Sequence, residues 1–201
     1  LAMNQLGNGL CDGDHDEDAL SVREADLSMR LRLGDSEENL LAAQSNLAIT
    51  YSTIGRFEEA LQIKRDVYSG RLELNGEEHE ETLLAANNYA SSLVRTDRFE
   101  EARSLLRRTL PVARRVLGES NEITLKMRKI YPGGLYSDPG ATLDELHEAA
   151  RTFEELAPTA RRVFGGIWRQ RRAMPSFPRR KKTRRVVWTS PRRSDRAPDA
   201  M

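Results

Sequence analysis

The hydrophobic positions of this chain recur at helical spacing, in pairs of segments that are separated by short polar turns. Two neighbouring segments show the pattern, with apolar positions at Leu40, Leu41, Leu47, Ile49 and Tyr51 in the first and at Phe57, Ala60, Leu61, Ile63 and Val67 in the second. Gly34, Gly76 and Gly118 follow such segments, in the place where a glycine commonly ends a helix. The pattern predicts an all-α chain of antiparallel helix pairs.

The same residues return at intervals of 42 positions. The sequence RFEEA at 56–60 recurs unchanged at 98–102, and Asn46-Leu47-Ala48 returns as Asn88-Tyr89-Ala90. A fixed period of this length indicates an α-solenoid, because one helix pair cannot bury its apolar face alone and must stack on its neighbours. We therefore predict one solenoid domain over residues 1–166, with repeats at about 1–36, 37–78, 79–120 and 121–165.

The first and last repeats depart from the pattern. In the first, the sequence CDGDHDEDAL at 11–20 has Asp16 in place of the aromatic residue, and its acidic side chains suit the positive end of a helix dipole. In the fourth, Pro132-Gly133-Gly134 is expected to break the first helix early, and Asp138-Pro139-Gly140 to lengthen the turn. Thr142 with a glutamate three residues later predicts a capping box at the start of the last helix.

Small side chains at repeated positions are expected to let the two helices of each repeat approach closely. A larger side chain at one of these alanines should cost about 1–3 kcal/mol by overpacking. An aromatic residue at the start of the second helix is expected to fill the gap beside the turn. The structural positions predicted in this way are Ala48, Phe57, Ala60, Ala90, Phe99 and Ala102.

The stretch 11–20 also looks like a metal loop, but its spacing argues against one. A calcium loop that starts at Asp12 would need glycine at its sixth position and glutamate at its twelfth, where this chain has Glu17 and Arg23. A zinc site built on Cys11 and His15 lacks two further ligands. Nucleotide-binding, zinc-protease and nucleophile motifs are all incomplete, so we expect no catalytic residue, no metal and no cofactor.

The net charge of +1 conceals an acidic body and a basic tail. Residues 1–166 hold 20 Lys and Arg against 29 Asp and Glu, whereas residues 167–201 hold 12 against 2. The proline-interrupted tail is predicted to be disordered. It could import the chain into the nucleus or contact nucleic acid with Trp168 and Trp188, it could dock on the acidic body, or it could be a misread exon end without a selected function.

Two further features bear on location. The single cysteine forms no internal disulfide, and no apolar run approaches the length of a membrane span. We expect a cytoplasmic protein without a membrane partner, nuclear if the basic tail is genuine.

The chain begins at Leu1 in the middle of the pattern, which suggests a fragment of a larger protein.

The repeat resembles the tetratricopeptide repeat, in the long form found in kinesin light chains. The matching elements are Asn46-Leu47-Ala48, Arg56-Phe57-Glu58-Glu59-Ala60 and the link Asn75-Gly76-Glu77-Glu78-His79, and the resemblance extends over about residues 1–165. It implies a non-enzymatic scaffold whose first helices line a concave groove that holds a peptide or a helix of a partner protein. Two alternatives remain open: a nuclear or RNA-associated protein that acts through the tail, and a sensor segment of a larger multidomain protein.

The resemblance also implies which residues line the groove. Asn46 and Asn88 occupy the position at which an asparagine pairs with the backbone of the ligand, and an amide suits this role because it carries both a donor and an acceptor. The expected groove residues are Gln5, Ser45, Asn46, Asn87, Asn88 and Tyr89. The alternative is that these asparagines bond neighbouring helix ends and stabilise the superhelix.

Overall fold

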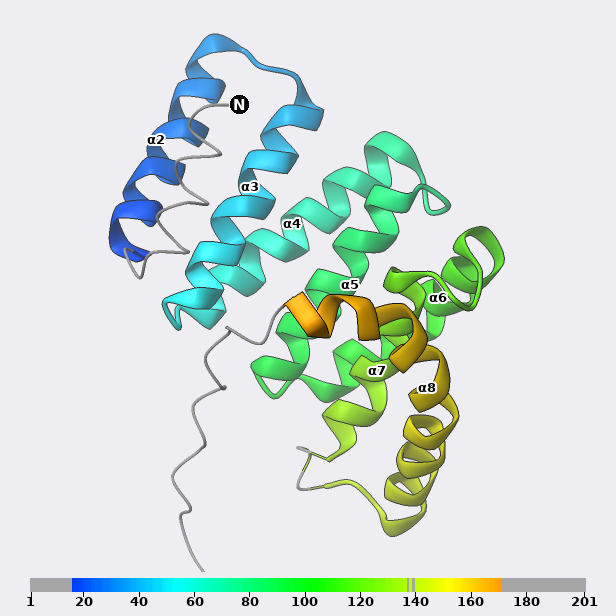
Figure 1. The fold of residues 1–201 in the computed structure, drawn as a ribbon. Helices are drawn as coiled ribbons and strands as arrows, with labels where there is room; N and C mark the ends of the chain where they lie inside the picture. Colours follow the sequence, from blue (N-terminus) through cyan, green and yellow to red (C-terminus); the bar gives the residue numbers. More distant parts are fainter. Residues whose placement is uncertain (1–15, 137, 139, 171–201) are drawn as a thin grey trace, which may run out of the picture.

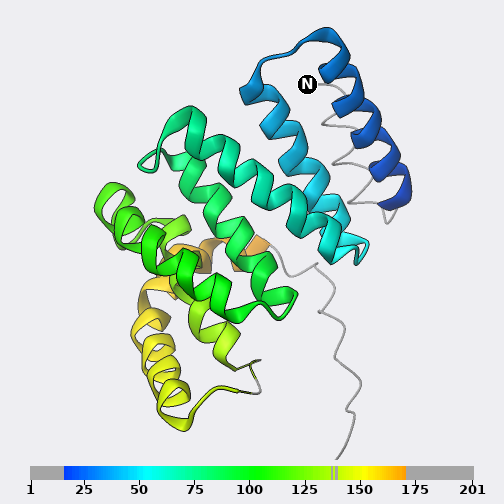
Figure 2. The same ribbon diagram turned by 180° about the vertical axis from the view of Figure 1, so that it is seen from behind.

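The computed structural model describes residues 16–136, 138 and 140–170. Over these residues the chain forms helices and no strands, which confirms the prediction of an all-α solenoid. Figures 1 and 2 show the helices stacked one after another, each packed on the next in sequence, and α5 also contacts α7. The helices are α2 (Asp16–Leu33), α3 (Glu37–Thr53), α4 (Phe57–Asn75), α5 (Glu80–Arg95), α6 (Phe99–Leu117), α7 (Glu122–Leu135) and α8 (Leu143–Gln170).

Two predicted segments, the acidic stretch near the start and the basic tail, lie partly outside the described residues. The acidic stretch is described only from Asp16, where α2 begins with three acidic residues in its first turn, as a helix start should. At the other end, α8 continues to Gln170, beyond the expected domain boundary at 166. Residues 171–201, which hold most of the basic tail, lie outside the described residues.

The helix ends show why the 42-residue period folds into hairpins. The glycines that follow α2, α4 and α6 have φ angles of +65°, +79° and +87°, and they are Gly34, Gly76 and Gly118. Glycine adopts this left-handed backbone without the penalty that a Cβ atom brings, so the predicted glycine caps are confirmed. The following helices start with side-chain caps, in which Ser36, His79 and Asn121 accept hydrogen bonds from backbone N–H groups of the first turn.

The turns inside the second and third repeats also contain one residue with a positive φ each. It is Gly55 in the second repeat, with φ +85°, and Asp97 in the third, with φ +60°.

Replacing Asp97 by glycine is expected to raise the free energy of unfolding by about 0.5 kcal/mol. Glycine removes the steric strain that a Cβ atom causes at a positive φ, and this gain outweighs the extra conformational freedom that glycine gives the unfolded chain. Urea unfolding followed by circular dichroism measures the change. Gly55→Asp is the matched control and should destabilise; a loss of stability in Asp97→Gly would contradict the argument.

Buried positions recur along the stack with the period of the sequence, and they form a large cluster and a smaller one. The equivalent leucines Leu41, Leu83 and Leu125 are 6%, 1% and 0% exposed. The hydroxyl of Thr82 donates to the carbonyl of Arg71 at 3.0 Å, and 42 residues later Thr124 donates to the carbonyl of Ala113 at 3.3 Å. Each of these buried bonds joins a first helix to the second helix of the preceding repeat.

The fourth repeat corrects one expectation and confirms another. We expected Pro132-Gly133-Gly134 to break the helix early, but α7 continues through them to Leu135. A Cβ atom on Gly134 would lie 3.2 Å from Val94 and 3.5 Å from Phe99, so this glycine allows α7 to pack closely on α5 and α6. The capping box is present: Thr142 accepts from the N–H of Glu145 at 3.3 Å, and the Glu145 carboxylate accepts from the N–H of Thr142 at 2.9 Å.

Candidate functional site

The six positions predicted to be structural are buried or half-buried. The four alanines, Ala48, Ala60, Ala90 and Ala102, are between 0% and 2% exposed. The two aromatic residues, Phe57 and Phe99, are half-buried at the starts of α4 and α6. The guanidinium of Arg95 stands 4.3 Å above the ring of Phe57, so this ring contacts the end of α5 as well as its own turn.

The structure describes five of the six expected groove residues, and Gln5 lies outside the described residues. Ser45 and Asn46 are half-buried on α3, and on α5 Asn88, which matches Asn46, and the adjacent Tyr89 are half-buried as well. Both helices pack on α4, which lies between them in sequence. The repeat therefore presents a half-buried asparagine on one first helix and its counterpart on the next.

Asn87 differs from its neighbours because it is buried, with 5% of its surface exposed. Its side-chain amide donates to the Oδ1 atom of Asn88 at 3.2 Å, while its own Oδ1 is buried without a hydrogen-bond partner. The ring of Tyr89 stacks on Tyr68 of α4, with 6.1 Å between centroids. Asn87 thus orients Asn88, and Tyr68 holds Tyr89.

Ile49, one of the apolar positions of the helical pattern, lies outside the core: its side chain is 49% exposed. Residues three and four apart share a face of a helix, so Ile49 lies on the same face of α3 as Asn46 and Ser45. An exposed apolar side chain beside two polar ones offers a contact for an apolar group of a ligand. The helical phase of Ile49 relative to Asn46 would have identified this position from the sequence.

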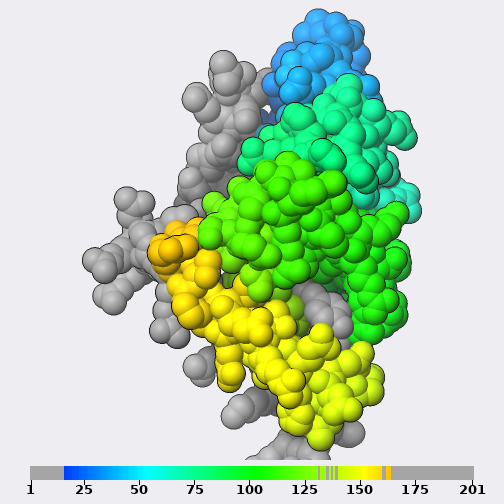
Figure 3. Space-filling model, turned by 90° about the vertical axis from the view of Figure 1, so that its right-hand side faces the viewer, coloured from blue at the N-terminus to red at the C-terminus, as the bar shows by residue number. Residues whose placement is uncertain are grey.

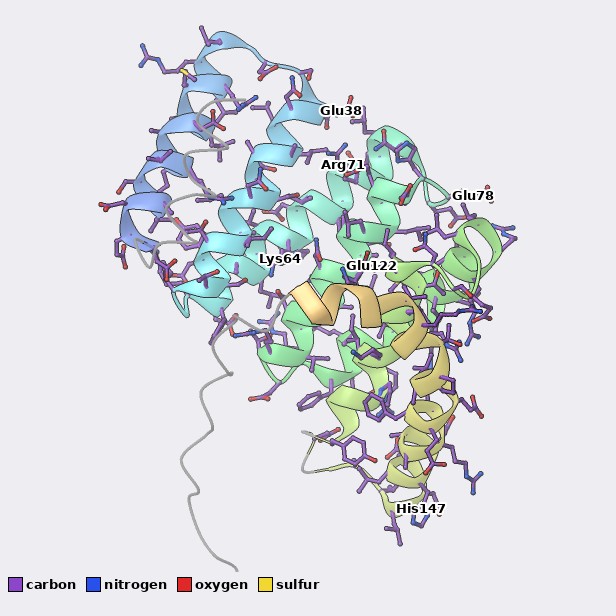
Figure 4. All side chains as sticks on the ribbon, viewed as in Figure 1. Glu38, Lys64, Arg71, Glu78, Glu122 and His147 are labelled. Atoms are coloured by element: carbon purple, nitrogen blue, oxygen red, sulfur yellow. The ribbon has the colours of Figure 1, made fainter. Side chains whose placement is uncertain are left out.

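A half-buried lysine is the most unusual charged group of this region, and sequence reasoning missed it. The Lys64 ammonium donates to the hydroxyls of Ser52 on α3 and Ser92 on α5, at 2.8 Å and 2.9 Å. Figure 4 shows Lys64 on α4, between these two helices. Burial and, to a lesser extent, the nearby charge of Arg95 lower the pKa of Lys64 to about 8. Its hydrogen bonds join two successive repeats.

A second enclosed cation, Arg71, lies at the other end of α4 and, unlike Lys64, is fully buried, with only 4% of its surface exposed. Its guanidinium donates to the backbone carbonyl of Glu38 at 3.4 Å and lies 3.6 Å from the carboxylate of Glu81 (Figure 4). Arg71 therefore connects the starts of α3 and α5. Because it is enclosed by these helices, we interpret it as a structural residue that holds two repeats in register.

The described part of the chain contains no group of three or more His, Cys, Asp or Glu side chains placed to hold a metal ion. Residues 11–15, which belong to the metal-like stretch, lie outside it. None of the helices over 16–136 and 140–170 combines the length and apolar character of a membrane span.

Comparisons with known proteins identify the repeat. Residues 39–115 match the family model of the tetratricopeptide repeat. A kinesin light chain from Podosopora anserina with nearly identical TPR-like repeats is similar in structure, with a TM-score of 0.67 at 17% identity, over 81% of this chain and 75% of that chain. BtubC from P. vanneervenii aligns with a TM-score of 0.60 at 18% identity, over 92% of this chain and 85% of that one. A search of curated proteins gives no match.

Proposed function

We propose that this tetratricopeptide-repeat chain, whose fold is that of the kinesin light chain-like repeats, is a non-enzymatic scaffold that holds a peptide or helix of a partner protein on α3 and α5. Folds of this kind typically act as scaffolds rather than enzymes. The observation that carries the proposal is a repeated polar position: Asn46 on α3 and its counterpart Asn88 on α5 are both half-buried. Stacked repeats provide extended surfaces of this type for peptides.

The hydrogen bonding of Asn88 supports a role in reading a peptide backbone. Its Oδ1 atom already accepts from Asn87, and within the described residues its Nδ2 group donates no hydrogen bond. The two N–H bonds of this amide are therefore available to a carbonyl group of a ligand. Asparagine is a poor residue for the middle of a helix, so two of them at equivalent positions favour a function beyond helix formation.

The surrounding side chains would determine which peptides fit. Ile49 supplies an exposed apolar contact one helical turn beyond Asn46. Tyr89 presents an aromatic side whose position is fixed by stacking on Tyr68. We therefore propose an extended peptide whose backbone bonds the asparagines and whose apolar side chains contact Ile49 and Tyr89.

Replacing Asn46 and Asn88 together by alanine is expected to weaken peptide binding at least tenfold, while the helical content stays the same, because both backbone contacts are lost. Peptides selected from a random library against the immobilised chain serve as probes, and calorimetry measures their affinity. The control is Gln62→Ala, which removes an exposed amide of α4 that, among the residues the structure describes, bonds Asp66 alone. Unchanged affinity in the double variant would show that the asparagines hold the superhelix and do not clamp a ligand.

A further inference from the structure

The first helices of successive repeats do not all approach one another equally closely. Among the helices that the structure describes, α5 packs directly on α7, whereas α3 and α5 make no comparable contact, although the 42-residue period relates the two pairs. The side view in Figure 3 shows the repeats as successive layers, from blue through green to yellow, so the width of each junction sets the distance from one repeat to the next. The junction between α3 and α5 is therefore wide, and the junction between α5 and α7 is narrow.

Side chains at equivalent positions differ between the two junctions. At the wide junction, Lys64 of α4 lies between the two first helices, and its ammonium donates to the hydroxyls of Ser52 on α3 and Ser92 on α5, at 2.8 Å and 2.9 Å. One period later, the three equivalent positions are apolar or lack a side chain, and they are Leu106, Val94 and Gly134. A long cation with two hydroxyl partners at the wide junction is thus replaced by an apolar contact at the narrow one.

The apolar set allows α5 and α7 to touch. Leu106 is 3% exposed and belongs to the large core cluster. A Cβ atom on Gly134 would lie 3.2 Å from Val94, so α7 already approaches α5 about as closely as packed side chains permit. Ser92 occupies the position of Gly134 at the wide junction and bonds the ammonium there, so the same close approach is blocked between α3 and α5.

The same exchange of a cation for an apolar residue occurs at the other end of these helices. Arg71 of α4 is buried between the starts of α3 and α5, where it bonds the carbonyl of Glu38 and lies 3.6 Å from the carboxylate of Glu81 (Figure 4). Its counterpart in α6 is Ala113, which is 0% exposed. The helix α4 therefore inserts a long basic side chain between neighbouring first helices at two levels, and α6 has a short apolar residue at both.

The wide junction is also the one with an asparagine on each side. Asn46 lies on α3 and Asn88 on α5, whereas the equivalent residue of α7 is Ile130, which packs against the large core cluster. The second amide and the wide spacing are thus lost together at the narrow junction. An extended chain rises about 3.3 Å per residue, so two amides can bond one peptide backbone only where their separation matches its backbone groups. The spacing of α3 and α5 is therefore a property that a peptide would read.

We propose that Lys64 and Arg71 are spacers that hold α3 and α5 apart, and that the gap they maintain sets the separation at which Asn46 and Asn88 bond one extended peptide. The spacing is a property of the chain alone, whereas its consequence for the peptide rests on the function proposed above. Both cations act as positioning residues, because they place the asparagines and do not touch the ligand. A spacer differs from a clasp in one respect: when it is removed, the two helices move together and not apart.

The test gives the wide junction the residues of the narrow one. The triple variant Ser52→Val, Lys64→Leu, Ser92→Gly carries at these positions what the next repeat carries. We expect α3 and α5 to lie closer together in this variant than in the wild type, and Lys64→Leu alone to shift them in the same direction. Lys64→Arg, which keeps a long cation between the two serines, should preserve the wild-type spacing.

The spacing is measured in the full chain, without a ligand, by electron paramagnetic resonance. Spin labels are attached to cysteines at Ile49 and Ser91, which are equivalent positions of α3 and α5, after Cys11 is replaced by serine. Circular dichroism shows whether each variant keeps its helical content, and urea unfolding gives its stability.

The library-selected peptides described above then test the consequence for binding. The triple variant is expected to bind them about tenfold more weakly or worse, and Lys64→Arg within about twofold of the wild type. Lys64→Leu should bind more weakly although its fold is at least as stable as that of the wild type. A lysine with only a structural role would not separate the two, because its loss would lower binding only by lowering stability.

Three results would overturn the proposal. They are an unchanged distance in both leucine variants, a longer distance, which would make the lysine a clasp, and a shorter distance with unchanged affinity for peptides that the Asn46→Ala, Asn88→Ala variant no longer binds. If the asparagine variant binds these peptides normally, the proposed function fails, whereas a shortened distance still establishes the spacers. The two failures are therefore distinguishable.

Discussion

Replacing Leu83 by alanine is expected to lower the free energy of unfolding by about 3–5 kcal/mol. Leu83 is 1% exposed on α5 and belongs to the main core cluster, together with residues of α4, α6 and α7. Truncation leaves a cavity inside a cluster to which helices of three successive repeats contribute, so the site has little freedom to collapse. Urea unfolding of wild type and variant, followed by circular dichroism, measures the loss.

The equivalent leucine of the preceding repeat is the matched control. Leu41 is 6% exposed and belongs to a smaller cluster, with Val67 and Ala85. We expect Leu41→Ala to cost about 2–3 kcal/mol, because fewer buried groups lose contacts there. If Leu41→Ala lowered the free energy of unfolding more than Leu83→Ala, the expectation that the larger cluster makes the larger contribution to stability would be contradicted.

The fold could be predicted from the sequence because its determinants are local and repeated. The second helices begin at Phe57 and Phe99, within the RFEEA sequence, and the preceding turns place Gly55 and Asp97 in the same backbone region. In a solenoid each helix packs mainly on its neighbours in sequence. A pattern that specifies one helix pair and its period therefore specifies most of the tertiary contacts.

The fourth repeat shows where local rules were insufficient. Pro132 and two glycines favour a broken helix on local grounds, yet Gly134 contacts Val94 and Phe99 of the preceding repeat, and α7 continues. Such a tertiary contact cannot be seen in the hydrophobic period, because that period has faded in this repeat. For the same reason the cleft of about 420 Å³ that α6, α7 and α8 line could not be predicted, because it depends on where α8 lies.

The candidate groove was predictable in position but not in detail. The period places Asn46 and Asn88 at equivalent positions, and no spacing rule indicates that the adjacent Asn87 is buried and donates to Asn88. The orientation of a side-chain amide depends on its neighbours in space. The hydrogen-bonding state of Asn88, on which the proposed recognition of a peptide backbone rests, therefore required the structure.

The period does reveal a second regularity once burial is known. Lys64 occupies the position at which the third repeat has Leu106, which is 3% exposed. The first repeat has Arg23 at the matching position, 41 residues before Lys64, and it is 6% exposed. Two successive repeats thus place a basic residue where the third has an apolar one. An ammonium in a core position needs polar partners, and Ser52 and Ser92 provide them.

Replacing Lys64 by leucine is therefore expected to raise the free energy of unfolding by about 1–4 kcal/mol at neutral pH. The desolvation of the ammonium is removed, and the apolar side chain is one that the same position holds in the third repeat. Urea unfolding at neutral pH measures the gain. The control is Lys126→Leu on the exposed surface of α7, where no burial penalty is relieved and no comparable gain is expected. A net loss in Lys64→Leu would show that the serine bonds outweigh desolvation.

The pH dependence distinguishes desolvation from a simple gain in packing. Burial lowers the pKa of Lys64 from 10.5 to about 8 in the folded state, so between these two pH values the unfolded chain binds more protons than the folded one. Stability of the wild type should consequently rise with pH across this interval, by up to about 3 kcal/mol in total, and below pH 8 the full penalty should be present. Lys64→Leu should lack this rise, so its gain in the free energy of unfolding over the wild type should shrink as the pH increases. Lys126→Leu should keep the rise, because it still contains Lys64. An advantage of Lys64→Leu that stayed constant up to pH 10.5 would mean that the lysine remains charged in its site and that its burial costs the fold nothing.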